Sequence, residues 1–252
     1  LKVWEVGVAS GWTTADAEPL IPQTALMGMS KPMVFDGIDD KVTISDNAAI
    51  DLGAGDFTIS LWANMPDWTS QFLIYKREDG DNRWYMSATS GDTLYFYSKA
   101  GGVPQITYEG TVGALTSHQD KWVHLVIVAD RSDSIKGYIN AALDDSDSGD
   151  TTDIDNGGDM VFGVDGSTGS TFATGRLNEI SLFKGVAFSL AEVQELFNDG
   201  VALDATAHSQ SSNLTGYWRN DGVSSWSDRS TNSNNATAAA GSPDTILLPE
   251  GT

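Results

Sequence analysis

Short runs in which apolar and polar residues alternate recur along most of this chain, and they constrain its fold more than any other feature. In residues 56–65, Phe57, Ile59 and Leu61 share one face, and the residues between them share the other. This period of two is that of a half-buried β-strand. Comparable runs occupy residues 33–36, 41–45, 72–76, 83–88, 93–98, 105–109, 122–129, 135–140, 160–164 and 177–183, with turn-forming residues between them. The regular spacing predicts an all-β sandwich of two antiparallel sheets.

One segment near residue 190 follows a helical period instead. Ser189 and Glu192 have the spacing of a capping box, in which each side chain bonds to a free backbone N–H of the first turn. Apolar residues follow at helical spacing as far as Phe197, and Gly200 offers a left-handed end. The pattern predicts one helix of about three turns that packs its apolar side on the sandwich.

The charge and composition of the chain exclude several classes of protein. Thirty-five acidic against 14 basic side chains give a formal net charge of −21, which opposes binding to a nucleic-acid backbone. No apolar run approaches the roughly 20 residues of a membrane span. The absence of cysteine excludes a disulfide scaffold, a thiolate zinc site and a cysteine nucleophile. The chain starts at Leu1 without a charged and then apolar leader, so we expect a signal peptide to be absent or already removed.

The alternating runs define a domain at residues 33–204 and leave two flanking segments. Residues 1–32 are expected to form an N-terminal arm or edge strands. Residues 205–252 are rich in Ser, Asn and Thr, and we expect them to form a docking arm or the last strands. Both segments carry apolar side chains that a free arm would leave exposed to water: Trp4, Trp12, Leu20, Ile21, Trp218, Trp226, Ile246, Leu247 and Leu248.

Four motifs occur in the order typical of the laminin G-like, concanavalin A-like jelly-roll superfamily, in its pentraxin-related branch. They are residues 35–42 (FDGIDDKV), 55–62 (GDFTISLW), 122–125 with 137–140 (WVHL and GYIN), and 175–183 (GRLNEISLF). The resemblance implies a two-sheet antiparallel jelly roll. The chain differs at Asn140-Ala141, where the family often has Asn-Gly, so this turn is expected to differ. The end of the chain, residues 247–252, is similar to the ends of jelly-roll proteins of tailed phages.

The sequence does not predict an enzyme. Some concanavalin A-like proteins are glycosidases, and a retaining glycosidase needs two carboxyl groups about 5–5.5 Å apart. The β-glucanase relatives provide this separation with a Glu-x-Asp-x-Glu or Glu-x-Asp-x-x-Glu strand, and no such sequence occurs in this chain. The nearest acidic cluster, residues 78–81, lies in a glycine-containing turn.

Calcium is the metal that this chain suits best, because hard cations take carboxylate and carbonyl oxygens. The three histidines are far apart in the sequence, and His124 reads as a buried strand residue rather than a zinc ligand. Residues 144–165 carry many aspartates, and this segment is interpreted either as a weak calcium loop or as a solvated acidic loop.

Two further acidic places are candidate calcium sites. By resemblance, Asp81 and Asn82 fall where pentraxins place a ligand pair, and Asp165 falls near their second ligand loop; the alternative is two exposed polar turns. The other place is Asp36, Asp39 and Asp40 beside Glu179, where many laminin G-like domains hold a structural calcium; the alternative is a hydrogen-bonded turn.

Sugar binding needs aromatic side chains with polar neighbours. The aromatic candidates lie along strands that could form one face: Trp68, Trp84, Tyr85, Tyr95, Tyr97 and Tyr108. Most aromatic residues of a sandwich fill its core, however. Trp68 follows Pro66-Asp67 in a loop and is expected to be exposed. The candidate ligand-binding residues are Trp68, Asp79 and Trp84.

Two functions remain open at this stage. The first is a non-enzymatic decoration or adhesion protein on a phage particle, which contacts other virion proteins or further copies of itself and binds cell-surface glycans. The second is a secreted, calcium-dependent carbohydrate-binding module. Either function implies a location on the virion surface or outside the cell.

Overall fold

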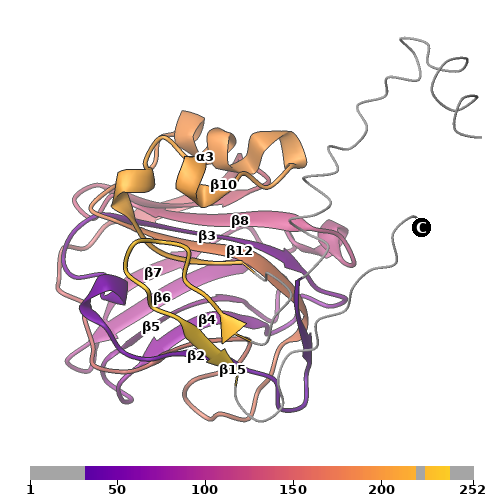
Figure 1. The fold of residues 1–252 in the computed structure, drawn as a ribbon, viewed down its shortest axis with the longest axis horizontal. Helices are drawn as coiled ribbons and strands as arrows, with labels where there is room; N and C mark the ends of the chain where they lie inside the picture. The colour runs from indigo at the N-terminus through magenta and orange to yellow at the C-terminus, as the bar shows by residue number, and fades with distance from the viewer. Residues whose placement is uncertain (1–31, 220–224, 239–252) are drawn as a thin grey trace, which may run out of the picture.

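The computed structural model describes residues 32–219 and 225–238, and it shows two antiparallel sheets packed face to face (Figure 1). Sheet A has seven strands in the order β1 (Met33–Asp36), β12 (Thr174–Lys184), β3 (Phe57–Asn64), β8 (Val123–Ala129), β9 (Ser134–Ile139) and β10 (Ala142–Ser148), with β13 (Leu214–Trp218) also paired to β12. Sheet B has eight strands in the order β14 (Ser225–Trp226), β15 (Ala236–Ala238), β2 (Val42–Ile44), β11 (Met160–Phe162), β4 (Phe72–Arg77), β5 (Arg83–Ala88), β6 (Leu94–Ala100) and β7 (Val103–Glu109). The predicted all-β jelly-roll sandwich is confirmed.

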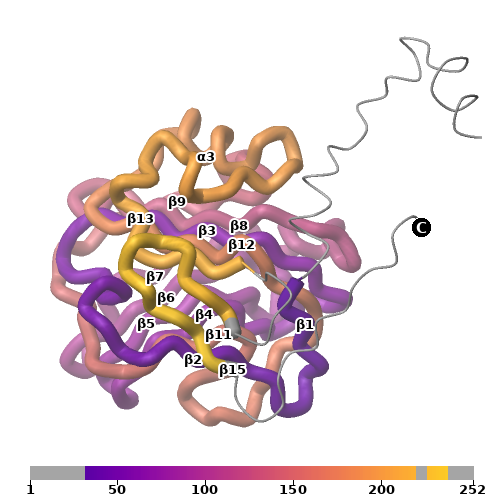
Figure 2. The backbone as a smooth tube through the Cα atoms, in the orientation of Figure 1, coloured from indigo at the N-terminus to yellow at the C-terminus, as the bar shows by residue number. Residues whose placement is uncertain are grey.

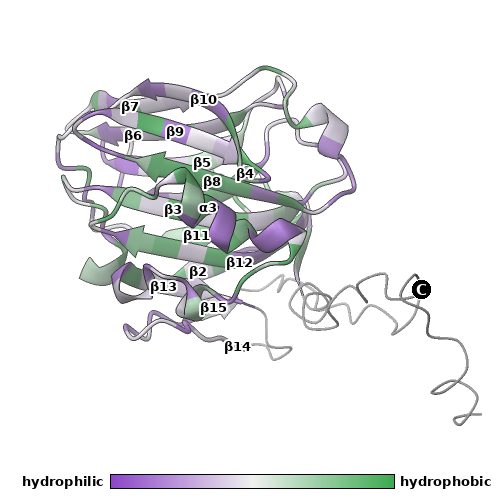
Figure 3. Cartoon of the chain, turned by 90° about the horizontal axis from the view of Figure 1, so that it is seen from above, coloured by the Kyte–Doolittle hydropathy of each residue, from purple (hydrophilic) through white to green (hydrophobic). Residues whose placement is uncertain are grey.

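The main core fills the space between the two sheets. Phe57, Ile59 and Leu61 of β3 point into it, as their spacing predicts, and Figure 3 shows hydrophobic residues concentrated in the middle strands of sheet A. All seven residues of β8 are nevertheless buried, including those that point away from sheet B. The outer face of sheet A must therefore be covered by another part of the chain.

Helix α3 (Leu190–Phe197) and the segments around it provide this cover, as Figure 2 shows above β8 and β9. Val126, Phe183 and Tyr217 on the outer face of sheet A belong to a second core with Val193 and Leu196 of α3. The short 3₁₀ helices are η1 (Ala48–Ile50), η2 (Thr116–His118), η3 (Asn198–Gly200), η4 (Ala205–Ala207) and η5 (Ser211–Asn213).

The predicted capping box of α3 is present, because the Ser189 side chain accepts from the Glu192 N–H and the Glu192 side chain bonds back to Ser189. The predicted end at Gly200 is two residues too late. Asn198, with φ 47°, forms the left-handed cap, so the helix has eight residues and about two turns. Asn tolerates this conformation better than most residues, which is why it can end the helix.

A buried polar pair lies under α3. His124 Nε2 is 2.8 Å from Ser60 Oγ, and the ring of Phe197 stacks on the imidazole at 5.8 Å. Burial lowers the pKa of His124 to about 3, so the ring is neutral at pH 7. In the part of the chain that the structure describes, no helix is long and apolar enough to cross a membrane.

Strand β10 lies in the acidic segment that was read as a loop. Two of its aspartates connect the edges of the two sheets: the Tyr108 hydroxyl donates to Asp144 Oδ2 at 3.1 Å, and the Glu109 N–H donates to Asp147 Oδ2 at 3.1 Å. Aspartate is rare in strands, so local propensity gave no signal here. The strand exists because β9 supplies its hydrogen-bond partners.

Part of the C-terminal segment completes the sandwich. Strand β13 pairs with β12, and β15 pairs with β2. Trp218 and Trp226 are buried in the main core, so these two apolar side chains are not available for docking on another protein. The other apolar residues expected in flanking arms fall in residues 1–31 and 239–252, outside the described part of the chain.

Candidate functional site

The outer face of sheet B carries a cluster of tyrosines, which we call the tyrosine platform: Tyr75, Tyr85, Tyr95 and Tyr97. Strand register pairs Tyr75 of β4 with Tyr85 of β5, and Tyr85 with Tyr97 of β6. The ring centroids of these two pairs are 5.0 Å and 5.4 Å apart, and Tyr95 lies 6.0 Å from Tyr85. Tyr85, Tyr95 and Tyr97 thus form a partly exposed aromatic surface across β5 and β6, and Tyr75, which is only 2% exposed, supports it from β4.

The hydroxyl groups of Tyr75, Tyr85 and Tyr95 stay protonated at neutral pH. Burial raises the pKa of Tyr85 well above its ordinary value, and the neighbouring tyrosines add to the shift. Burial also raises the pKa of Tyr75 and of Tyr95. Each of these three hydroxyl groups can therefore donate a hydrogen bond as well as accept one.

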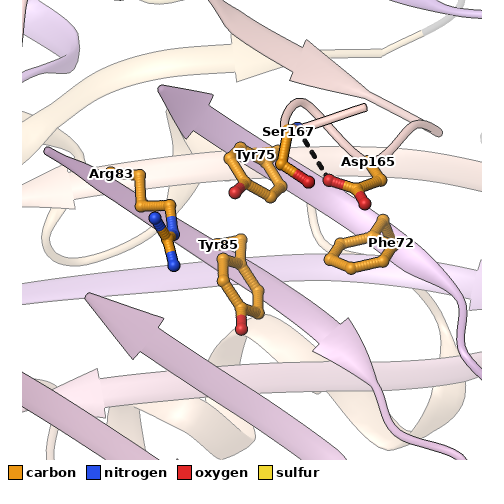
Figure 4. Close-up of a pocket in the computed structure, with 6 residues that line it drawn as sticks. All are labelled: Phe72, Tyr75, Arg83, Tyr85, Asp165 and Ser167. Atoms are coloured by element: carbon orange, nitrogen blue, oxygen red, sulfur yellow. Dashed lines mark hydrogen bonds between the residues drawn. The ribbon is translucent and has the colours of Figure 1, made fainter. Parts of the chain in front are cut away.

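A small pocket of about 170 Å³ opens at one end of the platform (Figure 4). Figure 4 shows Arg83 at one end, Asp165 and Ser167 at the other, and aromatic rings between them. The Asp165 carboxylate accepts the Ser167 N–H at 2.7 Å, which fixes it in the turn after β11. The Arg83 guanidinium lies 5.7 Å from the centroid of the Tyr97 ring. The pocket thus combines an aromatic wall with one cation and one carboxylate.

Two of the predicted ligand-binding residues are in the wrong place for this role. Trp84 points into the core between the sheets, because it alternates with Arg83 and Tyr85, which point outward. Trp68 is fully buried, since the loop between β3 and β4 folds this side chain into the main core. Asp79 is exposed and binds the backbone N–H groups of Asp81 and Asn82 in its own turn; the hydrogen bond from Asp81 is the first cause that holds its pKa below the usual range.

Sequence reasoning missed Tyr75, Phe72 and Arg83. The alternation of β4 places Tyr75 outward, but the inward-pointing neighbour is Lys76, a residue expected at the surface. Because Lys76 is polar and buried, the apolar and polar residues of β4 do not alternate in the sequence, and the outward direction of Tyr75 could not be recognised. Tyr85, Tyr95 and Tyr97 were recognised as aromatic candidates, and they do share one face with Tyr75, whereas Tyr108 points into the core.

The turn between β1 and β2 brings three predicted calcium ligands together. Carboxylate oxygens of Asp36, Asp39 and Asp40 lie within 4.8 Å of one another, and we call this group the acidic turn. Burial raises the pKa of Asp40, and the negative charges of Asp36 and Asp39 raise it further. Among the described residues no Lys or Arg pairs with them. The turn is also hydrogen-bonded internally, because Asp40 Oδ2 accepts the Asp36 N–H at 2.9 Å and Asp36 Oδ1 accepts the Ile38 N–H at 2.8 Å. Three converging carboxylates are suitable ligands for a calcium ion.

Glu179, expected beside the acidic turn, lies elsewhere. A bulge in β12 gives this residue a φ of 52° and turns its side chain to β13. There the Tyr217 hydroxyl donates to Glu179 Oε2, and Arg219 Nε lies 2.8 Å from Oε1. Burial raises the pKa of Glu179 to about 7, although Arg219 and Tyr217 act in the opposite direction. Its carboxylate is taken up by this internal network.

The other predicted calcium ligands are held separately. Lys99 Nζ lies 2.9 Å from the Asp81 carboxylate, and Asn82 Oδ1 accepts the Gly101 N–H at 2.9 Å. Asp165 is bound by Ser167 and Thr168 of its own turn. Within the described residues no hydrogen bond links Asp165 to Asp81 or Asn82.

Comparison with known proteins adds a family and a fold. The sequence pattern described as the concanavalin A-like lectin/glucanases superfamily matches residues 36–194. No curated protein sequence matches the chain significantly.

Several solved structures have a similar fold. A candidate carbohydrate-binding protein from Bacteroides ovatus is 15% identical, with a TM-score of 0.61, over 83% of this chain and 58% of its own. A heptameric SAP-like pentraxin from Limulus polyphemus is 14% identical, with a TM-score of 0.50, over 66% of this chain and 81% of its own. Domains LG4-5 of the mouse laminin alpha1 chain are 14% identical, with a TM-score of 0.50, over 63% of this chain and 44% of their own. At these identities the similarity concerns the fold.

Proposed function

Because this chain belongs to the concanavalin A-like lectin/glucanase superfamily, we propose that it is a non-catalytic binding module that takes glycans on its tyrosine platform. The observation that carries the proposal is the register of Tyr85 and Tyr97, whose partly exposed rings make one aromatic surface with Tyr95 across β5 and β6, backed by the buried ring of Tyr75 on β4. The C–H face of a pyranose ring packs on such a surface, and its hydroxyl groups bond to polar groups at the rim. The fold shared with a candidate carbohydrate-binding protein supports this choice.

The composition of the pocket favours binding over hydrolysis. A glycosidase uses two carboxyl groups that flank the scissile bond. The six residues that line the pocket include one carboxylate, Asp165, which already accepts the Ser167 N–H of its own turn. We therefore expect bound glycans to be released unchanged.

Calcium binding at the acidic turn is part of the proposed function. Asp36, Asp39 and Asp40 would supply oxygen ligands, and the ion would compensate their mutual repulsion. Its role there is structural, because the acidic turn connects β1 of sheet A to β2 of sheet B.

We also propose that the domain works on the exterior of a tailed-phage particle, in contact with other virion proteins. The similarity of residues 247–252 to phage jelly-roll proteins supports this location. Ala238 pairs with Val42, and β1 begins at Met33, so both ends of the described chain lie close to the acidic turn. In sheet B, β15 and the platform strands β4, β5 and β6 are on opposite sides of β2 and β11. An attachment through the flanking segments would leave the platform free.

A glycan array tests the binding function. The labelled chain should bind a defined set of glycans, and Tyr97→Ala should weaken this binding about tenfold, as expected when one aromatic contact is lost. Tyr97→Phe keeps the ring and should retain most of the binding. Leu190→Ala is the control, because it removes an exposed apolar side chain, 49% accessible, from α3 over the other sheet. Absence of any glycan signal, or equal binding by Tyr97→Ala, would contradict the proposal.

The location is tested separately with an antibody against the folded domain. On intact particles of the phage that encodes the chain, immunogold label should appear on the exterior. Label confined to free protein in the medium would favour the secreted carbohydrate-binding module instead.

A further inference from the structure

We infer that the pocket beside the tyrosine platform selects acidic saccharides, and that Arg83 binds the carboxylate of a hexuronic acid there. This inference rests on the proposed glycan binding and assigns a ligand class to the same site. Two observations support it: Arg83 forms no ion pair among the described residues, and the chemical groups follow a particular order along the pocket.

The Arg83 guanidinium forms no ion pair among the described residues. Lys76, Lys99 and Arg219 each pair with a carboxylate, but no carboxylate of the described residues lies within ion-pair distance of Arg83. This is notable in a chain with 35 acidic side chains. The Arg83 Nη1 donates to the Gly80 carbonyl, and the guanidinium packs over the Tyr97 ring. These contacts orient the group without neutralising its charge.

The neighbouring strands add positive charge beside Arg83. Strand register places Arg77 of β4 opposite Arg83, and Lys99 of β6 opposite Arg83 on the other side. Lys99 is compensated by Asp81, whereas Arg77, like Arg83, pairs with no carboxylate in the described part of the chain. Salt screens charges beyond about 8–10 Å, so a bound ligand is affected mainly by these cations, by Asp165, and by the acids of residues 78–81 in the turn that Arg83 contacts through Gly80.

The order of groups along the pocket matches that of a hexuronic acid. Figure 4 shows Arg83 at one end, Tyr75 and Tyr85 in the middle, and Asp165 with Ser167 at the other end. A hexuronic acid has its carboxylate at one edge of the ring, an apolar C–H face, and hydroxyl groups at the opposite edge. Its hydroxyl groups would donate to Asp165 while its carboxylate accepts from Arg83. The reverse orientation would place two carboxylates together, so only one orientation is favourable.

The size of the pocket indicates that it accepts a single sugar unit. At about 170 Å³ it is smaller than the roughly 300–1,000 Å³ of sites for drug-sized ligands. The rest of a longer glycan would lie on Tyr95 and Tyr97, outside the pocket.

The expected selectivity follows from one group on the ligand. A neutral hexose has a hydroxymethyl group where the hexuronic acid has its carboxylate. A hydrogen bond between two charged partners is about twice as strong as a neutral one, so we expect about a tenfold preference for the acid.

The test uses three monosaccharide probes of the same ring size. Methyl β-D-glucuronide, methyl β-D-glucoside and methyl β-D-glucosaminide are titrated into the full chain, and Kd is measured from NMR chemical shifts. The glucuronide should bind about tenfold more tightly than the glucoside. Arg83→Gln should abolish this preference, so that the glucuronide and the glucoside bind with similar Kd values. Lys136→Gln, which makes the same charge change on β9 of the other sheet, should preserve the preference.

The possible outcomes separate this inference from the proposed function. Equal affinity for glucuronide and glucoside, or a preference that persists in Arg83→Gln, overturns the acidic selectivity and leaves glycan binding intact. Tightest binding of the glucosaminide overturns it as well, since Asp165 would then dominate. If no probe binds and the glycan array is also blank, the proposed function itself is wrong. Circular dichroism of each variant verifies that the fold is retained.

Discussion

Replacement of Lys76 by methionine should destabilise the domain far more than the same replacement at Lys99. Lys76 lies in β4 with its ammonium group fully buried, 2.7 Å from Asp46 and 2.9 Å from Asp51, and it also donates to the Asn156 carbonyl. These partners come from two separate parts of the chain. The lysine therefore holds the segment after β2 and the acidic loop before β11 against sheet B.

The magnitude follows from what the substitution leaves behind. Methionine fills the volume of the lysine stem, so the loss is electrostatic. Removing one partner of a buried ion pair costs about 3–5 kcal/mol, because the other charge stays buried and unpaired. The Asp46 side chain is 39% exposed and Asp51 is 20% exposed, so water compensates part of this loss. We expect Lys76→Met to lower the free energy of unfolding by about 3 kcal/mol.

Urea denaturation at pH 7, followed by tryptophan fluorescence, measures the effect. Lys99→Met is the matched control, with the same change in shape and net charge. Its partner Asp81 is 65% exposed, so this variant should lose less than about 1 kcal/mol. Asp51→Asn in the Lys76→Met background should recover part of the stability, because it removes the charge left without a partner.

Two results would refute this reasoning. One is a difference of less than about 0.5 kcal/mol between the two lysine variants, the scale of an ordinary surface substitution. The other is a further loss of stability when Asp51→Asn is added to Lys76→Met. Equal m-values among the variants are required for the comparison, because the slope reports the surface exposed on unfolding.

Two further predictions concern the acidic turn and Glu179. Calcium at about 100 times its Kd should raise the melting temperature of metal-free protein by about 5–10 °C; Asp39→Asn should remove this response, and the exposed Asp133→Asn should not. An unchanged melting curve in chelator, with no metal in elemental analysis, would exclude the site. For Glu179, the native state keeps its proton up to pH about 7, whereas the unfolded chain releases it near the ordinary value of 4.5, so stability falls as the pH rises between these values. Glu179→Gln should remove this fall when unfolding free energies are compared at pH 5 and pH 8; parallel pH profiles of the two proteins would show that Glu179 does not titrate in this range.

Local sequence patterns were sufficient for the features that depend on neighbouring residues. The alternation around Phe57 predicts a strand because the two faces of a strand are fixed by covalent geometry. The Ser189–Glu192 capping box acts over one turn of backbone, and it forms as predicted. The acidic turn also depends on residues close in sequence, so the convergence of Asp36, Asp39 and Asp40 could be foreseen. The laminin G-like, concanavalin A-like identification is confirmed by the family match.

The tertiary structure decided which face of each strand meets the core and which residues meet across strands. Nothing in the sequence around Trp68 distinguishes a loop side chain at the surface from one folded into the core. Glu179 was misplaced because a bulge in β12, which forms only against β3, turns it toward Arg219.

The candidate site is one of the features that only the tertiary structure decided. Tyr75, Tyr85 and Tyr97 lie on three strands, and each strand's pattern specifies only that its tyrosine lies on one of two faces. The pairing of β4 with β5 and of β5 with β6 brings the rings together, and the turn after β11 then adds Asp165 opposite Arg83. Strand register is fixed by contacts between residues far apart in the chain, and one residue of slip would move every side chain to the other face. The sequence therefore determined the strands and their alternation, whereas the binding surface exists only because the sheet is assembled in this register.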